Sequence, residues 1–313
     1  MDPTEGDCAL GLRFRGDSLP GLVGGVEEAL PSVTVDLASE AVLGERWGRA
    51  DGRVIFSRDY HDGRPFLRIE HDPALGYRVW ADRHGTHLIA ADGRRCSAAV
   101  PDPGWRGLKL LASQVMPLAT TLHGREVMHA AGVVVKGHLI GIVAASGTGK
   151  SSTACRLIAG GASFFADDVL ALEIHDAGVR AHPGPRLANV HEADLAAIPE
   201  PGRRRLGPPL GQSDKVHLSP PGFPSSMRLD ALVFLSRRAR AGATEVASLD
   251  DVGRRLLGNA FLSYLDPPER LTRQLEVASV IARSVSLISV EIGADDDPGV
   301  VARRIEEWVG QAL

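Results

Sequence analysis

The sequence predicts an α/β protein in which a small antiparallel β-rich part precedes a larger part with a mixed sheet. Two observations lead to this prediction. Short segments of alternating apolar residues, separated by Asp-Gly turns, fill the first hundred residues. Farther along, apolar strands alternate with helical patterns, and one strand runs through a glycine-rich loop into a helix. We expect a β-rich N-terminal domain over 1–100, a connecting helix over 101–125 and a phosphate-loop domain over 126–313.

The composition is that of an ordinary globular protein, with 313 residues, 44% hydrophobic and 24% charged. A formal net charge of -4 argues against a general nucleic-acid binder, which needs a basic excess. No stretch approaches the roughly 20 apolar residues of a membrane span, and the N-terminus lacks the pattern of a signal peptide. The three scattered cysteines, Cys8, Cys96 and Cys155, predict reduced thiols and a cytoplasmic location.

The first part contains a series of short strand patterns, which we place at 9–15, 32–37, 53–56, 65–70, 76–80 and 86–90. It also contains four histidines, His61, His71, His84 and His87. Their spacing matches no metal motif, so we interpret them as separate residues rather than as a metal cluster.

Leucines at helical spacing predict a helix over 105–123, packed as a connector between the two parts. In the second part we expect strands at 127–135, 139–143, 163–174, 229–235 and 286–292. Helices are expected at 151–159, 249–259, 269–283 and 298–312. Prolines crowd into 183–224, which predicts a long loop of the kind that forms functional lids.

The strongest motif is a phosphate-binding loop between the strand 139–143 and the helix 151–159. It matches G-x-x-x-x-G-K-[ST] except that its first glycine is Ala144, which excludes a positive φ at the start of the loop. Unpaired amides at a helix N-terminus and the helix dipole favour an anion there. We therefore expect ATP and Mg²⁺ as ligands. The candidate binding residues are Ser146, Gly147, Thr148, Gly149, Lys150, Ser151 and Ser152.

A pair of adjacent carboxylates, Asp167 and Asp168, lies within the predicted strand 163–174. Buried carboxylates are costly unless an ion or a proton-transfer role compensates. Side chains alternate along a strand, so we expect the two aspartates to have different tasks, one at a metal and one at the acceptor hydroxyl.

In their order and spacing, His129-Ala130, the loop and Phe165-Ala-Asp-Asp-Val169 resemble the HPr kinase/phosphorylase family, whose fold is similar to that of phosphoenolpyruvate carboxykinase. The resemblance implies a kinase in which Lys150 binds phosphate and Ser151 ligates magnesium. It further implies that Asp167 is the base for the acceptor hydroxyl, that Asp168 is a second carboxylate on the metal side, and that His129 neighbours the base.

The chain departs from the family pattern at Ala144, Ala145, Ser152 and Ala130, and it lacks a recognisable HPr-binding loop. Over its length it is more similar to a branch of serine or peptide kinases found with peptide-modifying systems such as those of lasso peptides. The first half matches that branch by pattern only. Members of the wider family often form rings, which makes a homo-oligomer one option for this chain.

We therefore expect transfer of the γ-phosphoryl group of ATP to a serine-type hydroxyl of a peptide, protein or small molecule, without nucleic acid or membrane as partner. Basic residues of the proline-rich segment, Arg203, Arg205 and Lys215, are candidates for closing over the phosphates or gripping the acceptor. A solvated basic surface is the competing interpretation. The alternative function is a non-catalytic ATP-binding sensor or scaffold of the same fold.

Overall fold

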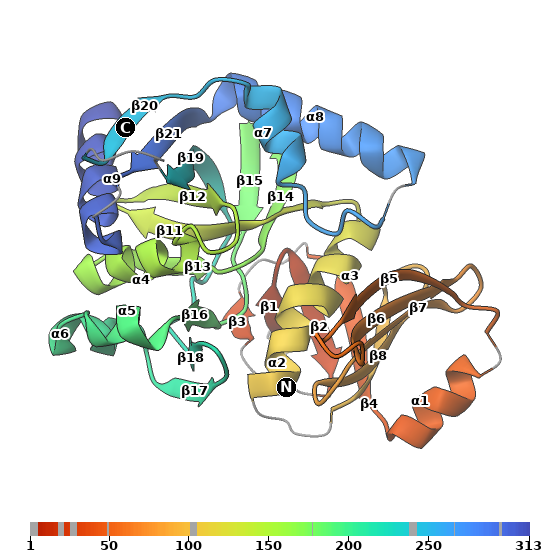
Figure 1. Cartoon of the computed structure of the whole chain (residues 1–313). Helices are drawn as coiled ribbons and strands as arrows, with labels where there is room; N and C mark the ends of the chain where they lie inside the picture. The colour runs from red at the N-terminus through yellow and green to blue at the C-terminus, as the bar shows by residue number, and fades with distance from the viewer. Residues whose placement is uncertain are drawn as a thin grey trace.

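The computed structural model describes residues 6–17, 22–25, 30–48, 50–100, 105–176, 178–237, 243–265, 267–293 and 296–313. It is a mixed α/β structure with two large sheets, one in each half of the molecule, and a connecting helical segment between them (Figure 1). No helix of the described ranges is long and apolar enough to cross a bilayer.

The first sheet has nine strands in the order β3-β1-β2-β4-β9-β8-β7-β6-β5. The strands are β1 (Gly6–Ala9), β2 (Leu12–Gly16), β3 (Val23–Gly25), β4 (Ser32–Leu37), β5 (Arg53–Asp59), β6 (Pro65–Asp72), β7 (Gly76–Ala81), β8 (Gly85–Ile89) and β9 (Arg95–Ala99). The prediction of an antiparallel unit holds for most pairs of neighbouring strands and is wrong for β4, which inserts between β2 and β9 and runs parallel to both. A helix that the sequence analysis missed, α1 (Glu40–Trp47), follows β4 and buries Leu43 and Trp47.

The predicted strand 9–15 is instead a hairpin, formed by β1 and β2. Leu10 and Gly11 both have positive φ, 52° and 78°, and reverse the chain within what looked like one alternating pattern. The backbone N–H of Leu10 donates to the carbonyl of Pro183 at 2.8 Å, so this turn docks on the second half of the molecule.

The connecting segment comprises α2 (Trp105–Leu110), a π-helical turn (Leu111–Val115) and α3 (Met116–Leu122). The π-helical turn ends two residues before Pro117, whose missing N–H cannot complete the regular hydrogen-bond ladder. Apolar side chains of this segment share one core with residues of the first sheet and with Val127, Val169 and Ala171. The segment therefore packs between the two halves of the molecule; 101–104 lie outside the described residues.

The second sheet is mixed, as the sequence predicts. Its strands are β10 (Glu126–Met128), β11 (Ala130–Val135), β12 (His138–Ala144), β13 (Ser163–Ala166), β14 (Leu170–His175), β15 (Gly178–His182), β19 (Met227–Arg237), β20 (Glu245–Ser248) and β21 (Ser286–Ile292). β12, β19 and β21 run parallel, and the other pairings are antiparallel. Helices α4 (Lys150–Gly160) and α9 (Pro298–Ala312) pack on one face, and α7 (Val252–Gly258) and α8 (Pro268–Ser284) on the other.

Two predicted strands of this half are each broken in two. The strand expected at 127–135 stops at His129, because β10 pairs with β14 whereas β11 pairs with β12 and β13. The strand expected at 163–174 stops at 167–169, where Asp168 has a φ of 71°. Both breaks occur where the chain passes from one set of partner strands to another, which brings His129 and Asp168 together.

The proline-rich segment is not the long loop that the sequence predicts. It forms a small sheet of three strands in the order β16-β18-β17, with two short helices. Its elements are β16 (Ala188–Val190), α5 (Glu192–Ala196), α6 (Glu200–Arg205), β17 (Pro209–Gln212) and β18 (Val216–Leu218). Prolines take up positions that need no backbone donor, such as the first turn of α6.

Candidate functional site

The loop between β12 and α4 has the backbone of an anion site. Gly147 and Gly149 have φ of 80° and 112°, which only glycine adopts readily. Helix α4 begins at Lys150 without a capping side chain and without an acidic residue in its first turn. Its first amide groups are therefore available to a negatively charged ligand, and the helix dipole favours one there.

Ala144 fits the start of this loop without strain. It is the last residue of β12 and is buried, and it is not among the described residues with positive φ. The strand conformation needs no glycine, so the departure from the motif at this position leaves the loop geometry intact.

Lys150 lies in the first turn of α4 with only 8% of its surface exposed. Its Nζ lies 3.6 Å from Oδ1 of Asp168, whose side chain is 40% exposed. Burial of a lysine with a carboxylate partner holds the ammonium group at the mouth of the loop, where a phosphate would compete for it.

Asp167 is held by groups that differ from those around Asp168. The hydroxyl of Ser151 donates to its Oδ1 at 2.9 Å. Its Oδ2 accepts from the backbone N–H of Asn189 at 2.9 Å and from the side-chain amide of Asn189 at 3.1 Å. Asp167 therefore belongs to the side of the site where Ser151 stands, and the expectation that the two aspartates face different partners agrees with this geometry.

Asn189 and His217, which sequence reasoning missed, form a chain of contacts behind Asp167. Oδ1 of Asn189 lies 2.7 Å from Nδ1 of His217, and since a carbonyl oxygen only accepts, the hydrogen is on Nδ1. The Ser213 hydroxyl lies 2.9 Å from Nε2 of the same ring. Burial lowers the pKa of His217 to about 4, and the nearby Lys109 ammonium acts in the same direction.

The stack of His217 on Trp105 connects this chain of contacts to α2, since the two ring centroids are 4.2 Å apart. No motif marks these residues, because Trp105, Asn189 and His217 are far apart in the sequence. The only available signal was the polar residue Asn189 in an otherwise apolar short strand.

His129 stands at the break between β10 and β11. Its Nδ1 lies 3.0 Å from the carbonyl oxygen of Asp168 and 3.3 Å from Oδ1 of the same residue. The ring stacks on Phe261, with centroids 5.8 Å apart. Burial, together with the Lys150 charge, lowers the pKa of His129, so the ring is neutral near pH 7 and donates through Nδ1.

Three of the predicted binding residues, Ser146, Thr148 and Ser152, differ in their contacts from what a phosphate-binding side chain would need. The Ser152 hydroxyl donates to Oδ2 of Asp194 in α5, which ties α4 to the small sheet. Ser146 is exposed, and Thr148 closes the loop through its backbone N–H, which donates to the carbonyl of Ala145 at 3.2 Å.

The arginines expected to close over the phosphates lie at the wrong end of α4. A Cβ added at Gly161, just past the C-terminus of α4, would lie 3.2 Å from Nη1 of Arg205. Arg203 pairs with Glu200 on the same helix at 3.4 Å. An 11-residue helix is about 16 Å long, so these side chains lie far from the loop. Lys215 lies in the vicinity of Lys109 and Asp214.

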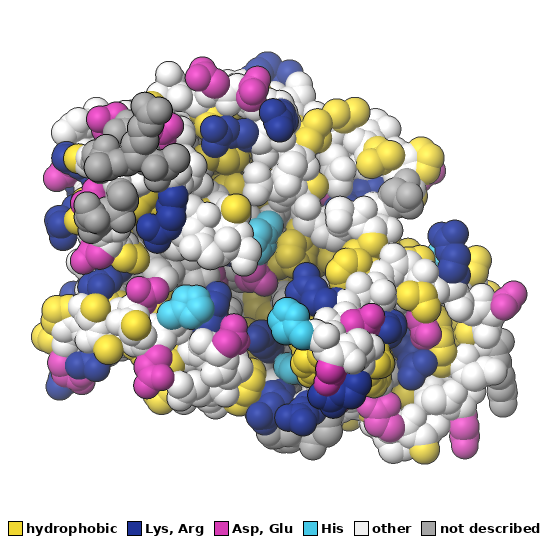
Figure 2. Space-filling view, in the orientation of Figure 1, with side chains coloured by type: hydrophobic (Ala, Val, Ile, Leu, Met, Phe, Trp, Pro, Cys, Tyr) yellow, Lys and Arg dark blue, Asp and Glu magenta, His cyan; other side chains and the backbone are white. Residues whose placement is uncertain are grey.

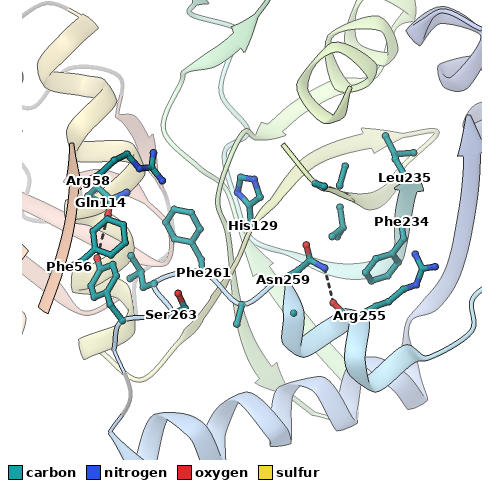
Figure 3. Close-up of a pocket in the computed structure, with 17 residues that line it drawn as sticks. Phe56, Arg58, Gln114, His129, Phe234, Leu235, Arg255, Asn259, Phe261 and Ser263 are labelled. Atoms are coloured by element: carbon teal, nitrogen blue, oxygen red, sulfur yellow. Dashed lines mark hydrogen bonds between the residues drawn. The ribbon is translucent and has the colours of Figure 1, made fainter. Parts of the chain in front are cut away.

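A cavity of about 700 Å³ opens beside the loop (Figures 2 and 3). Its wall includes Ala144 and Ala145 at the start of the loop, His129, and Phe261 and Tyr264 after α7. Phe56 of the first sheet also lines it, so both halves of the molecule contribute. A hollow of this volume is in the range of small-molecule sites.

The donor set beside the loop fits Mg²⁺. Mg²⁺ takes few protein ligands, keeps several waters and completes its shell with substrate phosphates. Ser151 and Asp167 supply a hydroxyl and a carboxylate 2.9 Å apart. Among the described residues no group of three His, Cys, Asp or Glu side chains could hold a metal ion by itself.

The sequence matches no known family model and no curated protein. Among solved structures, the chain is similar to the HPr(Ser) kinase/phosphatase from Coxiella burnetii, with 11% sequence identity and a TM-score of 0.29, over 59% of this chain and 94% of that chain. A likeness this distant carries no argument about function. The function of this chain is therefore inferred from the loop, the two aspartates and the cavity.

Proposed function

We propose that this protein is an ATP- and Mg²⁺-dependent kinase that transfers the γ-phosphoryl group to a hydroxyl. The observation that carries the proposal is the grouping of Lys150, Ser151, Asp167 and Asp168 around an uncapped helix N-terminus. Phosphoryl transfer needs charge neutralisation and an in-line nucleophile, and little else from the protein. The sequence motifs that resemble the HPr kinase family agree with this function.

The loop amides and Lys150 would hold the phosphates. The backbone N–H groups of the first turn of α4 point out of the N-terminal end of the helix, toward the loop. No atom lies within 4 Å of the position that a Cβ would take at Gly147 or Gly149, so the space beside these two residues is open. On nucleotide binding, the Lys150 ammonium would exchange its Asp168 partner for phosphate oxygens. Ser151 and Asp167 would hold Mg²⁺, which supplies further neutralisation of the phosphate charge.

The contacts favour exchanging the roles that the family resemblance assigns to the two aspartates. Both oxygens of Asp167 already accept hydrogen bonds, from Ser151 and from Asn189, which suits a fixed metal ligand. The Asp168 side chain is 40% exposed, and its Oδ1 lies 3.6 Å from the Lys150 ammonium and 3.3 Å from Nδ1 of His129, so both a cation and an imidazole are next to this carboxylate. We assign Asp168 as the base that takes the proton of the acceptor hydroxyl, with His129 orienting it.

The test compares two conservative variants with γ-labelled ATP, Mg²⁺ and a panel of hydroxyl acceptors. Asp168→Asn should bind Mg-ATP as the wild type does and transfer phosphoryl at least about 100-fold more slowly. Asp167→Asn should need a higher Mg²⁺ concentration for half-maximal rate, because its amide is a poorer ligand. Asp176→Asn, which changes an aspartate 86% exposed just after β14, is the matched control.

Transfer by Asp168→Asn at the wild-type rate, with loss in Asp167→Asn at saturating Mg²⁺, would restore the assignment from the family resemblance. Tight ATP binding by the wild type without transfer or hydrolysis would exclude the kinase and favour the nucleotide sensor.

A further inference from the structure

The cavity beside the loop has two ends, separated by His129 (Figure 3). One end is lined by the start of the loop, by Leu235 and by Arg255 of α7. The other end lies on the opposite side of His129. There Arg58 of β5 lies near Gln114 and Phe261. Because the start of the loop lines the first end, a nucleotide bound as proposed above would occupy that end. The far end is therefore free for the second substrate.

The far end is built by both halves of the molecule. The rings of Phe56 and Tyr264 are in contact, with centroids 4.9 Å apart, and join β5 to the segment after α7. The Tyr264 hydroxyl lies 3.4 Å from Oε1 of Gln114 in the connecting segment. Three parts of the chain therefore meet here, and an acceptor at this wall would touch all of them.

The cavity wall carries positive charge without a matching carboxylate. Arg58 and Arg255 both line the cavity, and neither side chain pairs with a carboxylate in the described part of the chain. No aspartate or glutamate is among the described residues of the cavity wall. An arginine of the neighbouring strand is neutralised, since Arg68 lies 2.7 Å from Asp59. Arg58 is exposed to the solvent in the cavity, so its guanidinium is accessible to an anionic group of a ligand.

We infer that Arg58 binds a carboxylate on the phosphoryl acceptor, so that the acceptor is a hydroxyl compound that also carries an acidic group. The aromatic rings of Phe56, Phe261 and Tyr264 would contact its apolar part, and its hydroxyl would point past His129 toward Asp168. This assignment depends on the phosphoryl-transfer function proposed above. It also gives the N-terminal sheet a role, which is to complete the acceptor site.

The experiment uses acceptors that differ only in the acidic group. An array of serine-centred pentapeptides with every residue at each flanking position is incubated with γ-labelled ATP and Mg²⁺, beside the pair glycerate and glycerol. The wild type should label peptides with Asp or Glu near the serine, and glycerate over glycerol, by about 10- to 100-fold in kcat/KM. Arg58→Gln should abolish this preference, and Arg58→Glu should shift it toward Lys- and Arg-containing peptides. Arg53→Gln, on the same exposed strand but outside the cavity, should keep the wild-type preference.

The outcomes separate this assignment from the function on which it depends. The inference is overturned if Arg58→Gln and Arg58→Glu keep the wild-type acceptor profile, or if Arg58→Gln instead raises the KM for ATP. It is also overturned if the wild type turns over ATP to water but shows no preference for acidic acceptors. A wild type that binds ATP and neither transfers nor hydrolyses it would overturn the kinase itself.

Discussion

At the scale of single residues, the two neighbouring aspartates have different surroundings because the backbone turns between them. Asp168 adopts a φ of 71°, a left-handed conformation that aspartate tolerates better than most residues. This turn directs one carboxylate to Ser151 and the other to Lys150 and His129. Both carboxylates therefore lie just after the end of β13 and not in the middle of a strand, and both are half-buried.

A second residue-scale feature is His87 of β8, which is fully buried and has no hydrogen-bond partner at either ring nitrogen in the described structure. Burial lowers its pKa from 6.5 to about 4. The unfolded chain takes up a proton below pH 6.5 that the folded protein does not bind. The His87 contribution to the free energy of unfolding therefore decreases as the pH falls from 6.5 to about 4.

We predict that His87→Leu raises the free energy of unfolding by about 1–3 kcal/mol at pH 7, since it removes an unsatisfied buried polar group. The gain should grow by about 2 kcal/mol more at pH 5, where the unfolded wild type is protonated at this position. Urea unfolding at both pH values measures it, with exposed His61→Gln as the control. An equal loss of stability between pH 7 and pH 5 in His87→Leu and the wild type would contradict the effect of burial on His87.

At the scale of elements, breaks in the strands position the site. The chain changes its partner strands between β10 and β11, and again between β13 and β14. Each of these pairs would be one continuous strand if both of its members had the same partner strands. The small sheet of β16, β17 and β18 then supplies Asn189 and His217, which hold Asp167 from behind. The segment with the most prolines thus supports the site instead of covering it.

This support predicts that Asn189→Ala slows phosphoryl transfer about tenfold and raises the Mg²⁺ requirement, because Asp167 loses a side-chain donor that fixes its orientation. His217→Phe keeps a ring to stack on Trp105 and loses the hydrogen bond to Asn189, so we expect a smaller effect of the same kind. The double variant should be less impaired than the two effects combined, as members of one chain of contacts are not independent. Steady-state rates over a Mg²⁺ titration measure the effect of each single variant and of the double variant. Fully additive effects of the two substitutions would show that Asn189 and His217 act separately.

At the scale of the whole molecule, the two halves are joined by the connecting helices and by the docking of the Leu10–Gly11 turn. Gly11 allows the turn to approach the Arg125 side chain closely, because a Cβ at this position would lie only 2.7 Å from Nε of Arg125. Behind it, Glu173 of β14 lies 2.9 Å from Nε of Arg125 and 3.2 Å from Nε2 of His182. The hydrogen bond with His182, together with the charges of His182 and Arg125, lowers the pKa of Glu173 to about 2.

Because the folded-state pKa is lowered, Glu173 stabilises the fold fully above its unfolded pKa of 4.5, and this contribution is lost as the pH falls toward 2. We predict that Glu173→Gln lowers the free energy of unfolding at pH 7 by on the order of 2 kcal/mol and has little effect near pH 2. Glu200→Gln, which removes only surface ion pairs on α6, should change stability by less than about 1 kcal/mol. Chemical unfolding across this pH range checks the difference, and an equal effect of the two substitutions would contradict a special role for the half-buried pair.

The local sequence was sufficient to predict what depends on near neighbours. The strand–loop–helix at 139–159, the parallel core strands 229–235 and 286–292, and the helices 269–283 and 298–312 all depend on periodicity and on short-range backbone preferences, and the structure has each of them within a few residues. The helical connecting segment also follows its leucine pattern, because those leucines mark the face that packs between the halves.

Tertiary contacts decided the rest. The sequence by itself placed Lys150, Ser151, Asp167 and Asp168 near one phosphate loop, because all of them lie on or beside two consecutive elements. It did not determine which aspartate faces Ser151, where the strands break, that β4 runs parallel to its neighbours, or that Arg58 and Phe56 of the first sheet line the cavity. These features depend on which distant strands pair and which surfaces meet, and such long-range pairings leave no periodic pattern in the local sequence.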